Sequence, residues 1–529
     1  MPPIFSTLSR AQLFHCLLAS ATILVTAVVL HYAWVAEDAF ITFRTVEQFF
    51  AGNGLRWNPH DRVQAFTHPL WLFVLIVGRT FYADLFLVAI WCGTLCSVAA
   101  FVTLGLRFHA NAGRLAVFLA LLVGSRAWRD FSTSGLENSL SSLLAAFTVV
   151  HFLRRSGTHT SQSVLLISLL FSFTLLNRID AGLLILPLVG VAFMNRARSV
   201  KLFPTGMLAI VGLSPFLGWT LFSLLYYGFP FPNTAYAKLG TGIDRLQLMA
   251  KGLVYLMNSL RLDPLTLPTI GAAIILGLKD QRPIFRWLAV GLLLQVFYLV
   301  MIGGDFMSGR FLSLPLFAAA FLVAQLISPL KLLLLGLVIL VTALGGELSS
   351  KLSLWLSPGG ERGIGDERKD FWRASSLRAC RLLWKVDEPC PQHRWITAGL
   401  AFRDSPRRVR IMGNIGMFGY YAGTDKIVLD HLALADPLLA RLAASPQSFI
   451  QPGHFRRKLP QGYFESVVNG SNMIVNENLR RYFEKLKIVT QGELWSWERL
   501  RAILELNGGL YDQELQRYEA DRLLKNEHQ

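Results

Sequence analysis

Residues 11–38 read AQLFHCLLASATILVTAVVLHYAWVAED, and this stretch predicts a membrane protein. The apolar run from Ala11 to Ala36 is long enough to cross a bilayer, which takes about 20 residues. It is longer than the apolar region of a signal peptide, about 7–15 residues, so we interpret it as a retained span. Two adjacent acids, Glu37 and Asp38, follow it directly. Ionisable groups at membrane depth are functional candidates, so we expect Glu37 and Asp38 to belong to the functional site of the chain.

The composition of the whole chain agrees with a membrane protein. Of its 529 residues, 53% are hydrophobic and 16% are charged, and the mean hydropathy is +0.44. A soluble globular protein has about 25% charged residues. The net charge of +17 would also suit a nucleic-acid partner, but no recognition motif accompanies it. Basic residues of membrane proteins gather in cytoplasmic loops, so we expect no nucleic-acid binding.

Apolar segments recur along the first two thirds of the chain and predict an α-helical polytopic membrane protein with about eleven spans. The segment 69–82 is short and contains Arg79, so we interpret it as interfacial or re-entrant. If it does not cross, the basic loops all fall on one side, which places the N-terminus in the cytoplasm. The candidate spans are 12–35, 85–106, 114–127, 136–153, 164–178, 181–195, 203–226, 265–279, 285–303, 311–328 and 330–347.

The character of the sequence changes after Leu348. Residues 1–348 form the predicted membrane domain, and residues 349–529 form a predicted mixed α/β soluble domain on the periplasmic side of a bacterial inner membrane. The stretches 408–413 and 426–430 are predicted strands, and the chain from Glu493 onward is predicted helix. An oxidising periplasm permits a disulfide between Cys380 and Cys390, but the sequence leaves that pairing open. The other cysteines, Cys16, Cys92 and Cys96, lie in predicted spans, where we expect them to be buried.

The loop after the first apolar run is rich in aromatic residues. Phe40, Phe43, Phe49 and Phe50 give it an amphipathic pattern that predicts a segment lying on the membrane. Arg44 falls within a helical turn or two of the acids and is a candidate substrate ligand.

The acidic pair Glu37–Asp38 is the predicted catalytic centre. One carboxylate can take a proton from an attacking hydroxyl while its neighbour positions the substrate or a metal ion. The alternative is a pair of solvated carboxylates at the membrane edge, and the residues by themselves leave it open.

Further polar groups recur on the predicted outer face beside short spans. Arginine and lysine can bind phosphate there, so the set suits a phosphorylated lipid. Two alternatives stay open, namely that the arginines and aspartates only pair with one another and that the histidines are structural. No P-loop or Rossmann glycine fingerprint is present, so we expect no direct nucleotide substrate. The candidates are Asp130, Glu137, Arg178, Asp180, Asn233, Tyr236, Lys238, Asp305, Arg310, His68 and, in PGHFRRKLP (452–460), His454.

An ordered set of motifs resembles glycosyltransferases of the GT-C fold, which use polyprenyl-phosphate sugars on the outer membrane face. The chain is similar in particular to the terminal arabinofuranosyltransferase family of mycobacterial cell-wall synthesis and to the related bacterial enzyme that places arabinofuranose on type IV pilin. The stretches that carry the resemblance are EDAFITFR (37–44), GNGLRWNP (52–59), RVQAFTHPLW (62–71), FPFPNTAYAK (229–238), GGDFMSGRF (303–311), DHLALADPLLARL (430–442) and PGHFRRKLPQGYFES (452–466).

The chain departs from the family pattern at two places. The family usually has two aspartates at the first motif, where this chain has Glu37 and Asp38, so a metal role at position 37 is in doubt. The family often has Gly-Leu-Thr-Asp where this chain has Ala433-Leu434-Ala435-Asp436.

The resemblance implies a reaction and a role for each candidate. The donor would be a polyprenyl phosphate carrying D-arabinofuranose, the acceptor pilin, another glycan or lipopolysaccharide, and the outcome inversion. No cofactor is implied with certainty, although a divalent metal is possible. Asp38 would be the base with Glu37 supporting it. The donor phosphate would lie near Arg310, Lys238, His68 or Arg178, and the substrate ligands would be Arg44, Asn233, Tyr236, Asp180, Asp305 and His454.

Two other classes of function remain to be weighed against an enzyme. A transporter or flippase for a lipid-linked sugar would show internal symmetry and broken spans near the bilayer midplane, whereas this sequence shows no repeat. A non-catalytic membrane scaffold for a surface organelle is the second alternative, and the departure at Glu37 keeps it in view.

The predicted topology is tested by a reporter fused after Gln529. We expect an alkaline phosphatase fusion at this position to be active and a green fluorescent protein fusion to be dark, because the chain is predicted to end in the periplasm. A bright fluorescent fusion with an inactive phosphatase would contradict the eleven-span topology.

Overall fold

The structure, a computed structural model, describes residues 9–108, 111–154, 160–326, 361–386, 388–446 and 450–527. The chain divides into two compact units, each assembled from separate stretches of sequence. Unit 1 comprises Met1–Ala36, Phe73–Phe216 and Arg245–Pro391, and unit 2 comprises Glu37–Leu72, Leu217–Asp244 and Gln392–Gln529. The domain boundary predicted at 348/349 lies outside the described residues and stays a prediction.

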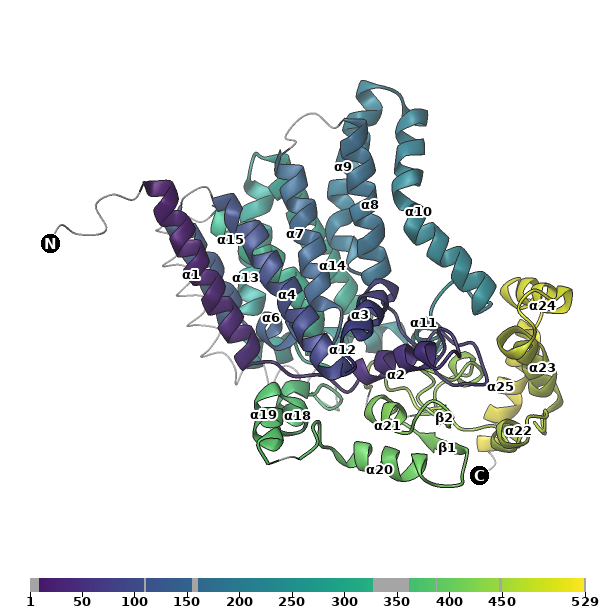
Figure 1. Ribbon diagram of the computed structural model, residues 1–529. Helices are drawn as coiled ribbons and strands as arrows, with labels where there is room; N and C mark the ends of the chain where they lie inside the picture. Colours follow the sequence, from purple (N-terminus) through teal and green to yellow (C-terminus); the bar gives the residue numbers. More distant parts are fainter. Residues whose placement is uncertain are drawn as a thin grey trace. The chain divides into compact units, whose positions relative to one another are not determined.

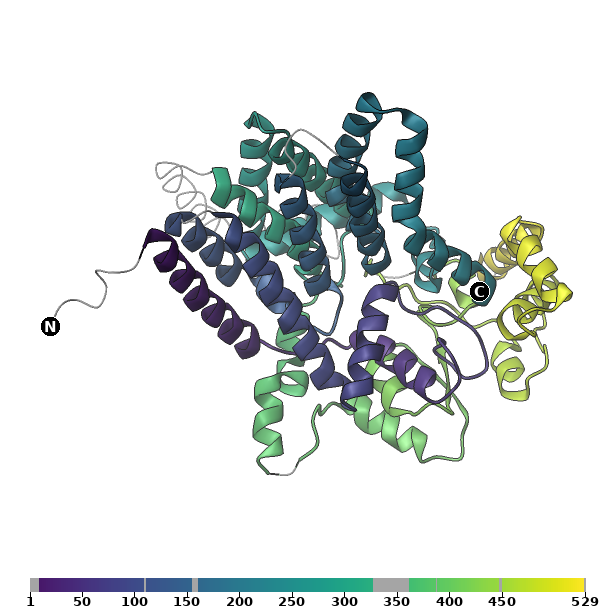
Figure 2. The ribbon, with the colours of Figure 1, turned by 45° about the horizontal axis from the view of Figure 1, so that its top comes forward.

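Unit 1 is built of helices, most of them apolar, that run side by side (Figures 1 and 2). Two further helices, α3 (Pro69–Phe81) and α10 (Leu202–Tyr226), contain boundaries between the units. The helices of unit 1 are α1 (Arg10–His31), α4 (Leu85–Gly105), η1 (Leu106–Phe108), α5 (Ala112–Gly124), α6 (Arg126–Phe131), α7 (Asn138–Arg154), α8 (Ser161–Asn177), α9 (Gly182–Ser199), α12 (Arg245–Leu262), α13 (Thr266–Lys279), α14 (Pro283–Met301), η2 (Arg310–Leu312), α15 (Ser313–Leu326), α18 (Glu367–Ser375) and α19 (Leu377–Trp384).

The apolar helices confirm a multi-pass, mostly helical membrane protein. Among the described residues, four helices are long and apolar enough to cross a bilayer, namely α1, α4 with η1, α10 and α14. The pair α12 and α13 bends by 108° at its break and could make a fifth span. Shorter apolar helices fall on most of the other predicted spans, and the predicted span 330–347 lies outside the described residues. The segment 69–82 is the apolar helix α3.

The centre of unit 1 is α15, whose residues from Ser313 to Gln325 are all buried. A helix that is apolar on every side needs neighbours on every side, and α15 packs against α5, α7, α13 and α14. Glycines permit other close approaches. A Cβ on Gly291 of α14 would collide with the backbone of Leu184 on α9.

Unit 2 combines a small sheet with short helices. Strands β1 and β2 pair in parallel from Val409 opposite Ile427 to Met412 opposite Asp430, and α21 connects them. Both strands and the C-terminal helices confirm the sequence prediction. The elements of unit 2 are α2 (Ala39–Phe50), α11 (Asn233–Leu239), α20 (Arg394–Arg403), β1 (Val409–Met412), α21 (Gly416–Tyr421), β2 (Ile427–Asp430), η3 (Leu439–Arg441), α22 (Tyr463–Asn469), α23 (Glu477–Gln491), α24 (Trp497–Asn507) and α25 (Asp512–Glu527).

The cysteines follow the sequence prediction only in part. Cys380 and Cys390 form a disulfide within unit 1. Cys96 is buried as expected and Cys92 is half-buried, whereas Cys16 is exposed, so its predicted burial is wrong. Cys16 lies on α1, where the residues that face the core are three or four apart, so the other faces of the helix point outward.

A fully buried arginine joins three segments of unit 2. Arg499 on α24 donates to the carbonyl oxygens of Leu225 and Tyr226 at 2.8 and 2.9 Å, at the end of α10. It also donates to the carbonyls of Val489 at 2.8 Å and Leu494 at 3.0 Å. Carbonyls at a helix end have no partner within the helix, so the guanidinium acts as a shared cap.

The Arg499→Ala substitution should therefore destabilise the protein. Each buried carbonyl left without a donor costs about 1–3 kcal/mol, so we expect a loss of at least about 3 kcal/mol and a clearly lower Tm. The measurement is thermal unfolding of the detergent-purified chain. Arg501→Ala is the matched control, because that side chain is 80% exposed and its ion pair with Glu505 contributes about 0–1 kcal/mol. Equal Tm values for the two variants would contradict the role given to Arg499.

Candidate functional site

The acidic pair lies at the start of α2 in unit 2. Glu37 is 7% exposed, and its Oε1 accepts the N–H of Met417 at 3.1 Å, at the start of α21. Gly416 lies directly against Glu37, since a Cβ at this position would collide with the Glu37 backbone and carboxyl. Asp38 is half-buried and precedes α2 without capping it through its side chain. The two neighbours therefore have different surroundings.

Burial, and with it the negative charges of Asp38 and Asp430, raise the pKa of Glu37 to about 8 against the opposing N–H groups of Met417 and Gly416. Near neutral pH Glu37 is therefore mostly protonated, whereas Asp38 is less buried and better solvated. Two adjacent acids whose environments differ in this way can serve as a neutral hydrogen-bonding group and an ionised base.

Two further buried acids, Asp430 and Asp436, lie at the end of β2 and in the loop that follows it. Asp430, the last residue of β2, accepts the N–H groups of Leu432 and Ala435 at 2.9 and 3.0 Å. Burial raises the pKa of Asp430 to about 6 and that of Asp436 to about 7. The sequence analysis did not select either as a site residue. Both residues lie within the motif DHLALADPLLARL (430–442), and this position was the sequence feature that could have identified them.

Two candidates from the first loop have partners within unit 2. Arg44 is 1% exposed and donates to the carbonyl oxygens of Trp57 at 2.8 Å, Lys426 at 2.6 Å and Gly419. Its donors therefore hold α2 against α21, which favours a structural role over substrate binding. His68 is buried, with its Nε2 2.8 Å from Oγ1 of Thr42 on α2.

The aromatic residues of α2 divide between two environments. Phe40 and Phe43 are buried and pack on Tyr420 of α21. Phe49 and Phe50 are 42% and 41% exposed. One face of α2 therefore packs against α21, and only Phe49 and Phe50 could contact a bilayer, so the membrane-surface placement of the segment stays a prediction.

Asn233 and Tyr236 of α11 surround Arg441. The Nδ2 of Asn233 donates to the carbonyls of Ala433 and Asp436 at 3.0 Å, so this side chain ties α11 to the loop after β2. The guanidinium of Arg441 lies over the rings of Tyr236 and Phe229 at 4.7 and 3.9 Å. The pocket among these residues has a volume of about 10 Å³, which is room for one water and not for a sugar.

Lys238 and His454, the remaining candidates in unit 2, are less enclosed. Lys238 is exposed on α11 and forms no ion pair within the described part of the chain. His454 is half-buried, and its backbone N–H donates to the carbonyl of Gln451 at 2.9 Å.

Unit 1 brings four predicted residues together around Glu137. Arg178 pairs with Asp180 at 2.5 Å and with Glu137 at 3.6 Å. Arg310 lies 3.4 Å from Glu137 and 3.8 Å from Asp305. The described cluster holds three acids and two arginines, so the ion pairs weighed as alternatives are present.

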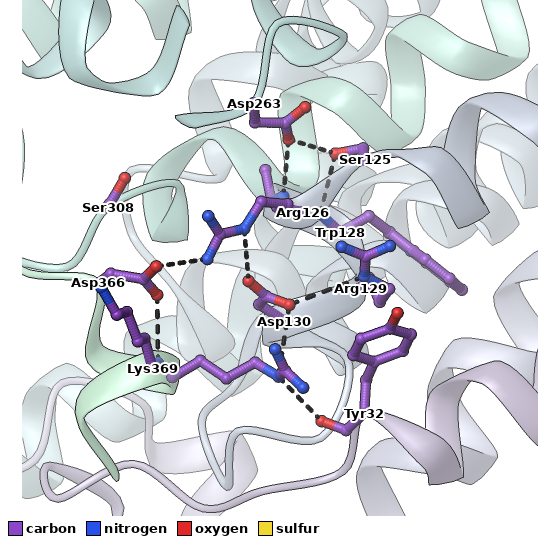
Figure 3. A network of polar contacts seen from close by, with 12 residues as sticks. Tyr32, Ser125, Arg126, Trp128, Arg129, Asp130, Asp263, Ser308, Asp366 and Lys369 are labelled. Carbon is purple, nitrogen blue, oxygen red and sulfur yellow. Dashed lines mark hydrogen bonds and ion pairs between the residues drawn. The ribbon is translucent and has the colours of Figure 1, made fainter. Parts of the chain in front are cut away.

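Asp130 belongs to a different cluster of unit 1, although the sequence grouped it with Glu137. Arg126, Arg129 and Arg368 lie 3.5, 3.9 and 3.5 Å from its carboxylate (Figure 3). Arg126 also pairs with Asp366 at 2.5 Å. The cluster connects α6 to α18. The Arg126–Asp130 pair follows i,i+4 helical spacing, whereas the contacts of Arg368 with Asp130 and of Arg126 with Asp366 join segments that are distant in the sequence.

The described residues contain no group of three His, Cys, Asp or Glu side chains placed to hold a metal ion. Glu37 is also a poor cation ligand, because it is mostly protonated near neutral pH and accepts an N–H from Met417. We therefore derive no step through a metal at this position.

Two curated proteins are similar to the chain, and both are named terminal β-(1→2)-arabinofuranosyltransferase. The protein from Corynebacterium glutamicum is 28% identical over 330 residues, which cover 54% of this chain and 47% of the relative. The protein from Mycobacterium tuberculosis is 26% identical over 371 residues, which cover 61% of this chain and 55% of the relative. The chain is therefore similar to two arabinofuranosyltransferases over part of their length. It spans about half the length of the curated relatives it matches.

Other comparisons add little. No protein-family model matches the chain. Among solved structures, apo ArnT from Cupriavidus metallidurans has a TM-score of 0.47 and 14% identity, over 79% of this chain and 86% of that one. A TM-score below 0.5 supports no conclusion about the fold.

The raised pKa of Glu37 predicts a pH-dependent stability. Because the folded pKa of about 8 exceeds the ordinary value of 4.5, the native state binds this proton more tightly than the unfolded state. This contribution is present below pH 4.5 and is lost as pH rises through 8. We expect Tm to fall between pH 5 and 8, and to fall less in Glu37→Gln.

The control for this measurement is Glu477→Gln, which removes a carboxyl that is 61% exposed. It should keep the pH dependence of the parent protein. Parallel Tm curves for the parent and Glu37→Gln would mean that Glu37 is ionised throughout this range.

Proposed function

We propose that the protein is a membrane glycosyltransferase that moves a sugar, D-arabinofuranose, from a polyprenyl phosphate to an acceptor on the periplasmic face. The observation that carries the proposal is the sequence similarity to two arabinofuranosyltransferases over 330 and 371 residues. The described structure supports it with an acidic pair directly after a membrane span, in which burial divides the roles of the two carboxyls.

In the proposed reaction Asp38 is the base. It takes the proton of an acceptor hydroxyl, while the hydroxyl oxygen forms a bond to the anomeric carbon. The bond from that carbon to the phosphate oxygen breaks, polyprenyl phosphate leaves, and the anomeric configuration inverts. The Asp38 carboxyl suits this task because it is less buried than Glu37, and a carboxylate can accept the proton of a hydroxyl.

Glu37 is the positioning residue of the pair. Its hydrogen bond from Met417 and its close contact with Gly416 hold the start of α2 to α21. The side chain of Glu37 accepts the N–H of Met417, while the neighbouring Asp38 lies in a less buried environment. Holding a base within a fraction of an ångström of its working position is a large part of catalysis.

The leaving phosphate needs a cation, and the candidates differ in their present partners. Lys238 is exposed and forms no ion pair within the described residues, so its charge is available. Arg178 and Arg310 lie among three carboxylates, which oppose binding of another anion. We therefore assign the phosphate first to Lys238 in unit 2, with His68 as a second candidate. Stabilising the leaving charge would supply much of the rate.

The test compares four strains: one that carries the parent chain, one that lacks it, one with Asp38→Asn and one with Asp404→Asn. Mass spectrometry of pilin, surface glycans and lipopolysaccharide should detect a pentose on one of these acceptors in the parent strain. The pentose should be absent from the strain that lacks the chain. We expect the pentose to disappear with Asp38→Asn, with a loss of at least about 100-fold.

Asp404→Asn is the matched control, because Asp404 is 66% exposed and pairs only with Arg403 in the described part of unit 2. It should keep the product. Immunoblots must show equal amounts of each variant in the membrane. Full product with Asp38→Asn would refute Asp38 as the base and favour a scaffold, and identical glycans in all four strains would refute the transferase for these acceptors.

A further inference from the structure

A groove in unit 1 lies between the end of α1 and the helix α19. Its volume is about 720 Å³, large enough for a lipid headgroup with part of its chains. Figure 1 shows α19 beside the end of α1 that leads into α2. The residues that define the groove are Leu30, His31, Arg378, Arg381, Trp384 and Lys385.

The charge of the groove is positive and is not neutralised locally. Arg378, Arg381 and Lys385 are exposed, and none of them forms an ion pair with another described residue. The described lining contains no acidic side chain. Other arginines of unit 1 do pair with carboxylates, as Arg126 does with Asp366 at 2.5 Å and Arg261 with Glu361 at 2.5 Å. Three unpaired cations beside one groove favour an anionic ligand.

Helix α19 and the residues directly after it expose apolar side chains. Leu382 is 61% exposed, Trp384 is 38% exposed and Val386 is 67% exposed. Tryptophan with lysine or arginine is characteristic of the membrane interface, where the ring lies at headgroup level and the cations meet phosphates. The groove is at that level, because α1 is a candidate span of 22 residues and ends at His31.

The groove is preformed by contacts that fix α19. The N–H of Leu377 donates to the carbonyl of Ala33 at 2.9 Å, directly after α1. The hydroxyl of Ser376 accepts the N–H of Ala379 at 3.1 Å and caps the helix. The disulfide between Cys380 and Cys390 ties α19 to the chain that follows it. A ligand that enters the groove therefore does not have to order the helix.

We propose that the groove between α1 and α19 binds the phosphodiester headgroup of an anionic phospholipid from the surrounding bilayer. The arginines and Lys385 contact the phosphate, and Leu382 and Trp384 contact the acyl chains. The occupant is a bilayer lipid because apolar and cationic side chains alternate on the same short helix at the end of a span. The site is separate from the sugar transfer proposed for Asp38 and does not depend on it.

The test is native mass spectrometry of the full chain in detergent, titrated with dioleoyl phosphatidylglycerol or dioleoyl phosphatidylcholine. We expect tighter binding of phosphatidylglycerol, and a loss of about 10- to 30-fold in its affinity with the double variant Arg381→Gln/Lys385→Gln. The control is Lys369→Gln/Arg373→Gln, which removes two exposed charges from α18 and leaves the groove intact. Its affinity should stay at the parent value.

Three outcomes would overturn the proposal. Equal affinity for the two lipids would show that the positive charge selects nothing, and equal losses in the two double variants would show that the effect is not specific to the groove. Displacement of phosphatidylglycerol by millimolar inorganic phosphate, or by a short polyprenyl monophosphate at lower concentration, would assign the groove to another ligand. Tm values for both double variants verify that each is folded.

Discussion

Within a bilayer each backbone N–H and C=O must find its partner inside the protein, and the architecture of this chain follows from that constraint. Apolar segments become helices, which satisfy their own backbone, and polar chemistry is left to the segments where helices begin and end. In unit 1 Glu137 precedes α7, Asp180 precedes α9, and Asp305 lies between α14 and η2. Glu37 and Asp38 follow α1 in the same way.

The acidic pair shows how burial distinguishes two chemically similar neighbours. Glu37 enters a buried position against α21, where desolvation raises its pKa and an N–H of the helix holds its carboxyl. Gly416 permits this approach because it carries no side chain. Asp38 stays half-buried one residue further on. The replacement of an aspartate by a longer glutamate at position 37 is consistent with this reach.

Arginines have three kinds of surroundings, and their chemistry differs accordingly. Arg44, Arg457 and Arg499 are buried and donate to backbone carbonyls, so they hold segments together. The arginines around Glu137 and Asp130 pair with carboxylates. Those of α19 are exposed and unpaired within the described residues, which is the state that suits an incoming anion. Only the surroundings separate these groups, because the side chain is the same in each.

The sequence by itself determined the helical membrane character, both strands of unit 2 and the acids beside α1, because apolar periodicity and β-branched runs are local signals. It did not determine which side chains meet. Arg44 donates to the carbonyl of Gly419, and Phe40 packs on the ring of Tyr420. These partners are more than 370 residues apart in the sequence, so no local pattern predicts the contacts. Ala433 is a non-glycine residue with a left-handed φ of 67° in the buried loop after β2. Tertiary packing decided these points, because hydrogen bonding and burial depend on neighbours that are distant in the chain.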